Sequence, residues 1–79
     1  MTLKDFGITL SNMYQNAPEG KKVLMIHLFG IKYAKEIKES DYKVSDILKQ
    51  AEIRISHDIN IRAGIHLADY VIIKDDTNL

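Results

Sequence analysis

Six polar side chains between residues 49 and 62 are the part of this chain whose residue types best suggest a function. An asparagine amide can pair with the edge of adenine, and an arginine can pair with guanine or with a phosphate. Serine and lysine suit phosphate oxygens. The alternative is that these side chains form only the solvated face of a surface helix. The six candidates for contact with DNA are Lys49, Arg54, Ser56, His57, Asn60 and Arg62.

Two short helices with a turn between them are predicted to position these side chains. Ser56 can cap the second helix by accepting a hydrogen bond from a backbone N–H in its first turn, and Gly64 supplies a left-handed end. A helix, a tight turn and a capped second helix describe a helix-turn-helix, which presents its second helix to the major groove. The first helix carries an apolar stripe at helical spacing, formed by Val44, Ile47, Leu48 and Ala51.

The second helix is expected over residues 56–63, with its polar side chains facing outward. Ile59 is predicted to point into the core, with Ile55 at the entry of the helix and Ala63 one turn further on. Asp58 in the first turn suits the positive end of the helix dipole, but its carboxylate would repel a phosphate. This orientation leaves the polar candidates free to contact a partner.

The isoleucines of the same region also alternate along the chain, which is the signature of a strand. Residues 53–67 are therefore also compatible with a β-meander that turns near 57–58 and 63–64. In that arrangement no helix would be available for insertion into DNA. Periodicity alone leaves both interpretations open. The alternating residues are Ile53, Ile55, Ile59, Ile61, Ile65 and Leu67.

The N-terminal part of the chain predicts one further helix. Thr2 and Asp5 have the spacing of a capping box in which aspartate replaces the usual glutamate. Apolar residues then follow at helical spacing over residues 3–16. The segment NAPEG at 16–20 contains the one proline of the chain and marks its clearest break.

Residues 21–39 predict the most buried helix, because their apolar side chains cover a broad helical surface. A strand over 22–29 is the alternative, since Val-Leu-Met-Ile is also a buried-strand composition. Tyr70–Ile73 is β-branched and aromatic, which predicts a short C-terminal strand or wing-like segment. Residues 74–79 are expected to form a frayed tail.

The length of the chain allows one domain over residues 1–79, with its core at about 3–73. The composition, 46% hydrophobic and 28% charged, is that of a globular protein. A domain of this size buries roughly 60–65% of its unfolded surface and is usually marginal alone. Because cysteine is absent, disulfides and thiolate metal sites are excluded. A homodimer is the expected supplement.

Charge and hydropathy limit the possible partners. Eleven basic and eleven acidic side chains give zero net charge, which counts against a free-standing nucleic-acid binder. The absence of cysteine and of a secretory leader indicates a cytoplasmic location. The longest apolar run, Val23–Ile26, is far shorter than the ~20 residues of a membrane span. A basic patch outside the second helix is available from Lys21, Lys22, Lys32, Lys35 and Lys38.

Catalysis and metal binding are not predicted. No nucleophile, base and orienting acid can be assembled from the scattered serines and carboxylates. Four isolated glycines provide no phosphate-binding loop. The three histidines, His27, His57 and His66, lack the i, i+4 spacing of a helical zinc motif. We therefore expect neither enzyme activity nor a cofactor.

Three segments resemble a group of short prokaryotic proteins described as helix-turn-helix-like domains. The segments are IHLFGIKYAKEI at 26–37, SDILKQA at 45–51 and IRAGIHLADYV at 61–71. The resemblance spans nearly the whole chain and implies a small helical domain, without an established activity. The chain departs from the general pattern in its turn, which is one residue longer and has Glu52 at the usual glycine position.

The sequence therefore predicts a mainly α, helix-turn-helix domain of about four helices with a short C-terminal β-strand or wing. The expected function is non-enzymatic binding of double-stranded DNA, by a small transcriptional regulator or by a prophage- or defence-associated accessory protein. The alternative is a protein–protein interaction module built on the same scaffold, which the zero net charge favours.

Overall fold

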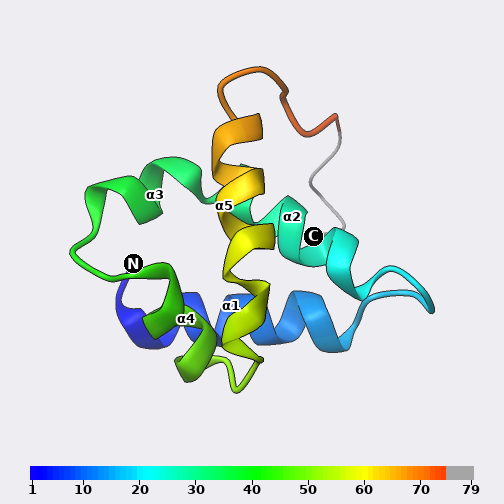
Figure 1. The fold of residues 1–79 in the computed structure, drawn as a ribbon, viewed down its shortest axis with the longest axis horizontal. Helices are drawn as coiled ribbons and strands as arrows, with labels where there is room; N and C mark the ends of the chain where they lie inside the picture. Colours follow the sequence, from blue (N-terminus) through cyan, green and yellow to red (C-terminus); the bar gives the residue numbers. More distant parts are fainter. Residues whose placement is uncertain (75–79) are drawn as a thin grey trace.

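The computed structural model describes residues 1–74, which contain five α-helices, one short 3₁₀ helix and no strand. Helix α5 lies across α2, and its N-terminal end reaches α4 (Figure 1). No helix in this described part is long and apolar enough to cross a membrane. The elements are α1 (Leu3–Gln15), α2 (Lys22–Lys32), α3 (Ala34–Glu39), α4 (Val44–Gln50), the 3₁₀ helix η1 (Ile55–His57) and α5 (Asp58–Leu67).

The helical predictions are confirmed and the strand alternatives are wrong. Residues 22–29 lie within α2, and residues 55–67 are helical. The strand or wing predicted at Tyr70–Ile73 is also wrong, since this segment has no regular secondary structure. A strand needs a second strand to satisfy its backbone groups, and the described residues provide none. The predicted frayed tail lies outside the described residues, apart from Lys74.

The start of α1 confirms the predicted capping box. The hydroxyl of Thr2 accepts a hydrogen bond from the Asp5 N–H at 3.1 Å, and the Asp5 carboxylate accepts one from the Thr2 N–H at 2.9 Å. The bond from the Thr2 N–H holds the pKa of Asp5 below its ordinary value, with a smaller contribution from the Thr2 hydroxyl. The helix ends at Gln15, one residue before the predicted boundary.

The single helix predicted over residues 21–39 is divided at Tyr33. Its backbone angles there, φ −108° and ψ 17°, lie outside the helical region. The hydrogen bonds on either side continue, from the Tyr33 N–H to Phe29 and from the Ile37 N–H to Tyr33. The change of direction gives α3 its own axis and buries Ala34 and Ile37.

Three helix pairs hold the core together. Helix α5 packs on α2, and α1 packs on α4 and on α2. Where α1 crosses α4, a Cβ on Gly7 would lie 2.9 Å from the Gln50 Cβ and 3.1 Å from the Gln50 backbone carbon. The absence of a side chain therefore allows α1 to approach α4. The largest fully buried side chains, which fill the space between the helices, are Phe6, Leu10, Ile26, Phe29, Ile47, Leu48 and Ile61.

The prediction that Gly64 ends the second helix is wrong. Helix α5 continues to Leu67, and Gly64 lies inside it at the point of contact with α2. A Cβ on Gly64 would collide with the His27 carbonyl oxygen and lie 3.0 Å from the Gly30 Cα. A Cβ on Gly30 would in turn collide with the Ile61 carbonyl oxygen. Gly64 is therefore needed for close approach of two backbones, not for a left-handed turn.

The turn between α4 and η1 confirms that Glu52 occupies the usual glycine position. Its φ is +60°, in the left-handed region. The Glu52 N–H donates to the Lys49 carbonyl at 3.1 Å, and the Ile53 N–H donates to the Leu48 carbonyl at 2.9 Å. These two bonds define a Schellman motif, and the buried Leu48 and Ile53 side chains belong to the same core cluster. The turn is thus closed by hydrogen bonds and by apolar packing.

Candidate nucleic-acid interface

The second helix of the unit begins with η1, not with a serine cap. Ser56 lies inside η1 and is exposed, so the prediction that it caps the helix is wrong. The residue before α5 is His57, and no side chain caps that end. Instead the His57 N–H donates to the Arg54 carbonyl at 3.1 Å, and this bond forms the 3₁₀ turn that leads into α5. The Ser56 hydroxyl is therefore left facing solvent.

The rotation of α5 about its axis differs from the prediction. Ile61 is fully buried and Gly64 contacts α2, so this side of the helix faces the core. Ile59 was predicted to point inward, but it is 68% exposed. The prediction was wrong because isoleucines occupy two sides of the helix, and the glycine contact decides which side packs on α2.

The opposite side of η1 and α5 forms a continuous outward face. It is made of the exposed residues Ile55, Ile59, Arg62 and His66, with Ser56 beside the first of them. These positions recur at the i, i+4, i+7 and i+11 spacing of one helical stripe. Sequence reasoning did not place either isoleucine or His66 on this face. The signal that could have placed them is Gly64, once it is read as a crossing point.

Arg62 lies in the middle of the outward face and is tied to Asp58. Its Nη2 donates to the Asp58 carboxylate at 2.9 Å, at i, i+4 spacing. The Arg62 side chain is 61% exposed, and a surface pair of this kind contributes only a fraction of a kcal/mol, roughly 0.2–0.5. A guanidinium also has five N–H donors. Arg62 can therefore contact a second acceptor while it keeps its ion pair with Asp58.

His57 and Asn60 belong to a different part of the surface. The Asn60 amide lies 2.9 Å from the His57 Nδ1, and the His57 ring lies 6.3 Å from the ring of Tyr14 on α1. Both side chains are only half-exposed. The Lys22 ammonium lies over the Tyr14 ring, 4.7 Å from its centroid. These two candidates therefore lie apart from Arg62, and His57 contacts α1 at the start of α5.

Lys49 and Arg54 lie on the two sides of the turn that joins α4 to η1. Lys49 lies in the last turn of α4, and Arg54 immediately precedes η1. Both are exposed. Arg54 and Ser56 lie at the N-terminal end of the second helix. Lys49, Arg54, Ser56 and Arg62 are thus exposed, whereas His57 and Asn60 are half-buried and contact each other.

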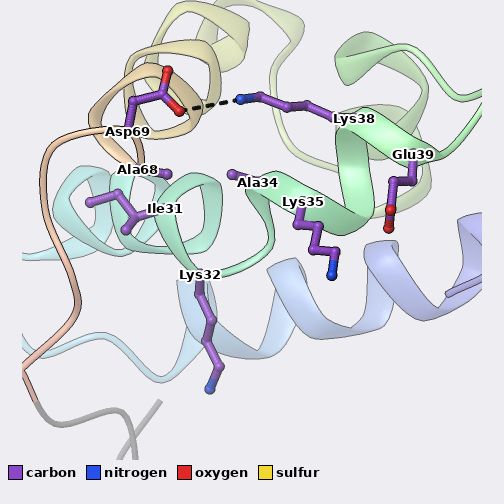
Figure 2. Close-up of a pocket in the computed structure, with 8 residues that line it drawn as sticks. All are labelled: Ile31, Lys32, Ala34, Lys35, Lys38, Glu39, Ala68 and Asp69. Carbon is purple, nitrogen blue, oxygen red and sulfur yellow. Dashed lines mark ion pairs between the residues drawn. The ribbon is translucent and has the colours of Figure 1, made fainter.

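The lysines of α2 and α3 do not converge on one binding point. Figure 2 shows Lys38 reaching towards Asp69, at the end of α5, and the ion pair measures 3.6 Å. Lys35 and Glu39 point away from the hollow of about 420 Å³ that they border. Ile31, Ala34 and Ala68 form the apolar part of its lining. This region therefore has less phosphate-binding character than the predicted basic patch.

The histidines and carboxylates of the described residues are dispersed. Within residues 1–74, no three of them lie close enough together to hold a metal ion. The His27 ring nitrogen Nδ1 lies 3.1 Å from the Val23 carbonyl oxygen, one turn earlier in α2. His27 is thus engaged with the backbone of its own helix.

Comparison with protein families agrees with this geometry. A family model described as an HTH-like domain matches residues 2–74. The chain belongs to this HTH-like domain family. The resemblance seen in its three segments is confirmed, and α4, the turn at Glu52 and η1–α5 form the predicted helix-turn-helix unit. No curated protein and no solved structure matches the chain significantly.

Proposed function

We propose that this HTH-like protein binds double-stranded DNA without enzymatic chemistry, by placing the outward face of η1–α5 in the major groove. The observation that supports this is the division of α5 into two sides. One side is fixed on α2 through Gly64 and Ile61, and the other exposes Ser56, Ile59 and Arg62. Helix-turn-helix proteins use the exposed side of the second helix, near its N-terminus, to contact base edges.

Each exposed residue has a role that suits its chemistry. Arg62 contacts guanine or a phosphate, and Ser56 contacts a phosphate near the start of the helix. Arg54 and Lys49 contact the DNA backbone on the side of the turn. Ile59 lies between them and meets a thymine methyl group, which is an apolar base contact. In this arrangement His57 and Asn60 position the helix through Tyr14, as their contacts support.

The proposed protein is a small transcriptional regulator, or an accessory protein of a prophage or defence system, and acts in the cytoplasm as a homodimer. A two-fold dimer would place two copies of α5 on two half-sites of a palindromic sequence. The small size of the domain supports a dimer, because a chain of 79 residues buries a limited core.

Binding to mixed DNA fragments over a series of salt concentrations tests the proposal. Contact with phosphates releases counterions, so the affinity must fall steeply as salt rises. Arg62→Ala is expected to weaken binding and to reduce the logarithmic salt slope by about 1 if Arg62 contacts a phosphate. Lys35→Ala, an exposed cation on α3, is the matched control and should change neither. No retention on DNA at low salt would remove the proposal.

A protein-binding module is the second candidate, and the exposed isoleucines favour it. Ile55 and Ile59 lie on the same outward face, and the chain has zero net charge. An apolar docking face depends on such side chains. The two candidates differ at Ile59→Ala, because the phosphate contacts that dominate non-specific DNA affinity remain in this variant. A protein partner would lose its central contact.

A further inference from the structure

Asp58 is the one acidic residue of η1 and α5, and the DNA contacts proposed above give it no role. It lies in the first turn of α5, where a carboxylate suits the positive end of the helix dipole. The same carboxylate repels phosphates and so lowers the affinity of this face for DNA of any sequence. It is nevertheless paired with Arg62, the cation in the middle of the outward face. The pair therefore needs an explanation other than phosphate binding.

The contact with Asp58 leaves a complete pair of Arg62 donors free. Only Nη2 bonds to the carboxylate, at 2.9 Å. The two hydrogens of Nη2 belong to different edges of the planar guanidinium, one beside the Nε hydrogen and the other beside an Nη1 hydrogen. Whichever hydrogen Asp58 accepts, the other edge keeps two parallel donors. The Arg62 side chain is 61% exposed, so this edge is available to a partner.

Two parallel donors match the O6 and N7 acceptors of guanine in the major groove. They also match two oxygens of a phosphate, but a phosphate brings a full negative charge close to the Asp58 carboxylate. The guanine edge carries no net charge, so Asp58 opposes it far less. The pair of Asp58 and Arg62 therefore favours a base over the DNA backbone.

The same contact restrains the Arg62 side chain before DNA arrives. An arginine on a helix surface otherwise samples many rotamers, and fixing one of them on binding costs free energy. Asp58 holds the Nη2 end from one helical turn away, and its own side chain is only 31% exposed. The guanidinium is thus partly oriented in the free protein, which improves selection between bases more than a freely moving cation does.

We propose that Asp58 is a positioning residue, which orients Arg62 to read a guanine in the major groove and disfavours a phosphate contact at the same place. The proposal rests on the DNA binding of the proposed function and assigns Arg62 to a base. Asp58 lowers the affinity for DNA in general and raises the selectivity between sequences, since selectivity is a difference between two affinities.

The first test measures base preference with DNA duplexes that have a randomised central segment. The sequences that the wild type retains are expected to share a guanine. Affinity for one such duplex is then compared with affinity for the same duplex carrying A·T in place of this G·C pair. The wild type is expected to prefer the guanine duplex by about 10-fold or more. Arg62→Ala should abolish the preference.

Substitutions of Asp58 test its positioning role. Asp58→Asn keeps the size but removes the charge, so the contact with Arg62 weakens and the guanine preference should fall at least about threefold. Affinity for mixed-sequence DNA should rise at the same time, because a repulsion of phosphates is gone. Asp58→Glu should keep the preference, since a glutamate also reaches an arginine at i, i+4 spacing.

Glu39→Gln is the matched control for charge. Glu39 is exposed on α3, and its substitution changes the net charge by the same amount as Asp58→Asn. It should leave the guanine preference unchanged. Circular dichroism checks that every variant keeps its helices.

A double variant separates positioning from repulsion. If Asp58 acts through Arg62, adding Asp58→Asn to Arg62→Ala changes no base preference, because none remains. Affinity for mixed-sequence DNA should still rise, since the repulsion of phosphates does not need Arg62. A preference that changes in the Arg62→Ala background would contradict a role through Arg62.

The outcomes distinguish this proposal from the proposed function. No retention of any duplex at low salt would overturn both. Retention without a shared guanine would overturn this proposal alone, as would a salt slope lowered by about 1 in Arg62→Ala, which indicates a phosphate contact. Full guanine preference in Asp58→Asn would remove the positioning role of Asp58. Loss of the preference in Glu39→Gln would remove it too, because net charge would then be the cause.

Discussion

The two sides of α5 have similar compositions and opposite environments. Ile61 and Gly64 on one side are packed against α2, while Ile59 on the other side is largely exposed. Both sides carry isoleucine, so hydrophobicity does not distinguish them. The difference comes from Gly30 and Gly64, which let the two helix backbones touch on one side only. Backbone approach, more than apolar content, therefore decides which side of this helix faces a partner.

Truncation of one isoleucine on each side is the strongest test of that comparison. Ile61→Ala should reduce the free energy of unfolding by about 2–5 kcal/mol, because it leaves a cavity in a fully buried place. Ile59→Ala should change it by no more than about 0.5 kcal/mol, since most of that side chain is in solvent. Urea denaturation followed by circular dichroism measures both. Equal losses would mean that α5 is rotated about its axis relative to the structure.

Gly64→Ala should give the next largest loss, about 3 kcal/mol of unfolding free energy, because the new methyl group has no room. It would meet the His27 carbonyl oxygen and the Gly30 Cα, and neither is the end of a flexible side chain. Gly30→Ala should cost a similar amount. The double variant should lose less than the two losses combined, because the helices need to separate only once. Strict additivity in denaturation experiments would argue against a shared contact.

Glu52→Gly should have a smaller effect, and a stabilising one. A left-handed conformation costs a residue with a Cβ about 1–2 kcal/mol, and glycine avoids this strain. Glycine also loses more conformational freedom on folding, so the net gain should be about 0.5–1 kcal/mol. Glu39→Gly at the end of α3 is the control, where glycine should destabilise the helix. A loss of stability at Glu52→Gly would indicate that the Glu52 side chain contributes to the turn.

The acid stability of α1 should show the smallest effect, far from either side of α5. The pKa of Asp5 is lowered in the folded protein, so its carboxylate stabilises the fold fully above the ordinary value of 3.8. That contribution is lost as the pH falls through the lowered folded-state pKa. Asp5→Asn should flatten this part of the stability curve, measured by thermal melts between about pH 2 and 5. Thr2→Ala should keep most of the slope, because the backbone N–H that lowers the pKa most remains.

Local signals in the sequence predicted much of the fold. Thr2 and Asp5 located the start of α1, since a capping box involves residues only three apart. The apolar stripe from Val44 to Ala51 located α4, and Glu52 stands at the position where such turns need a left-handed residue. The family resemblance correctly favoured helices over the β-meander. Each of these signals depends on neighbours along the chain.

The features that the sequence did not predict depend on contacts between distant residues. Gly64 can end a helix or admit another backbone, and only the position of Gly30 distinguishes the two roles. Ile59 was assigned to the core for the same reason, because its partner surface was unknown. Tyr70–Ile73 has a strand composition, but strand formation also requires a pairing segment. The positions of the His57 and Asn60 side chains likewise depend on a distant residue, because the His57 ring contacts Tyr14 on α1.

The glycine pair also bears on how this domain could diversify. Because a methyl group already fails to fit at either position, the packing of α5 on α2 tolerates little change at this contact. Residues 55, 59, 62 and 66 are under no such restriction, since they face solvent. Descendants of one ancestor could therefore acquire different targets by exchanging a few outward side chains, without any redesign of the scaffold beneath them.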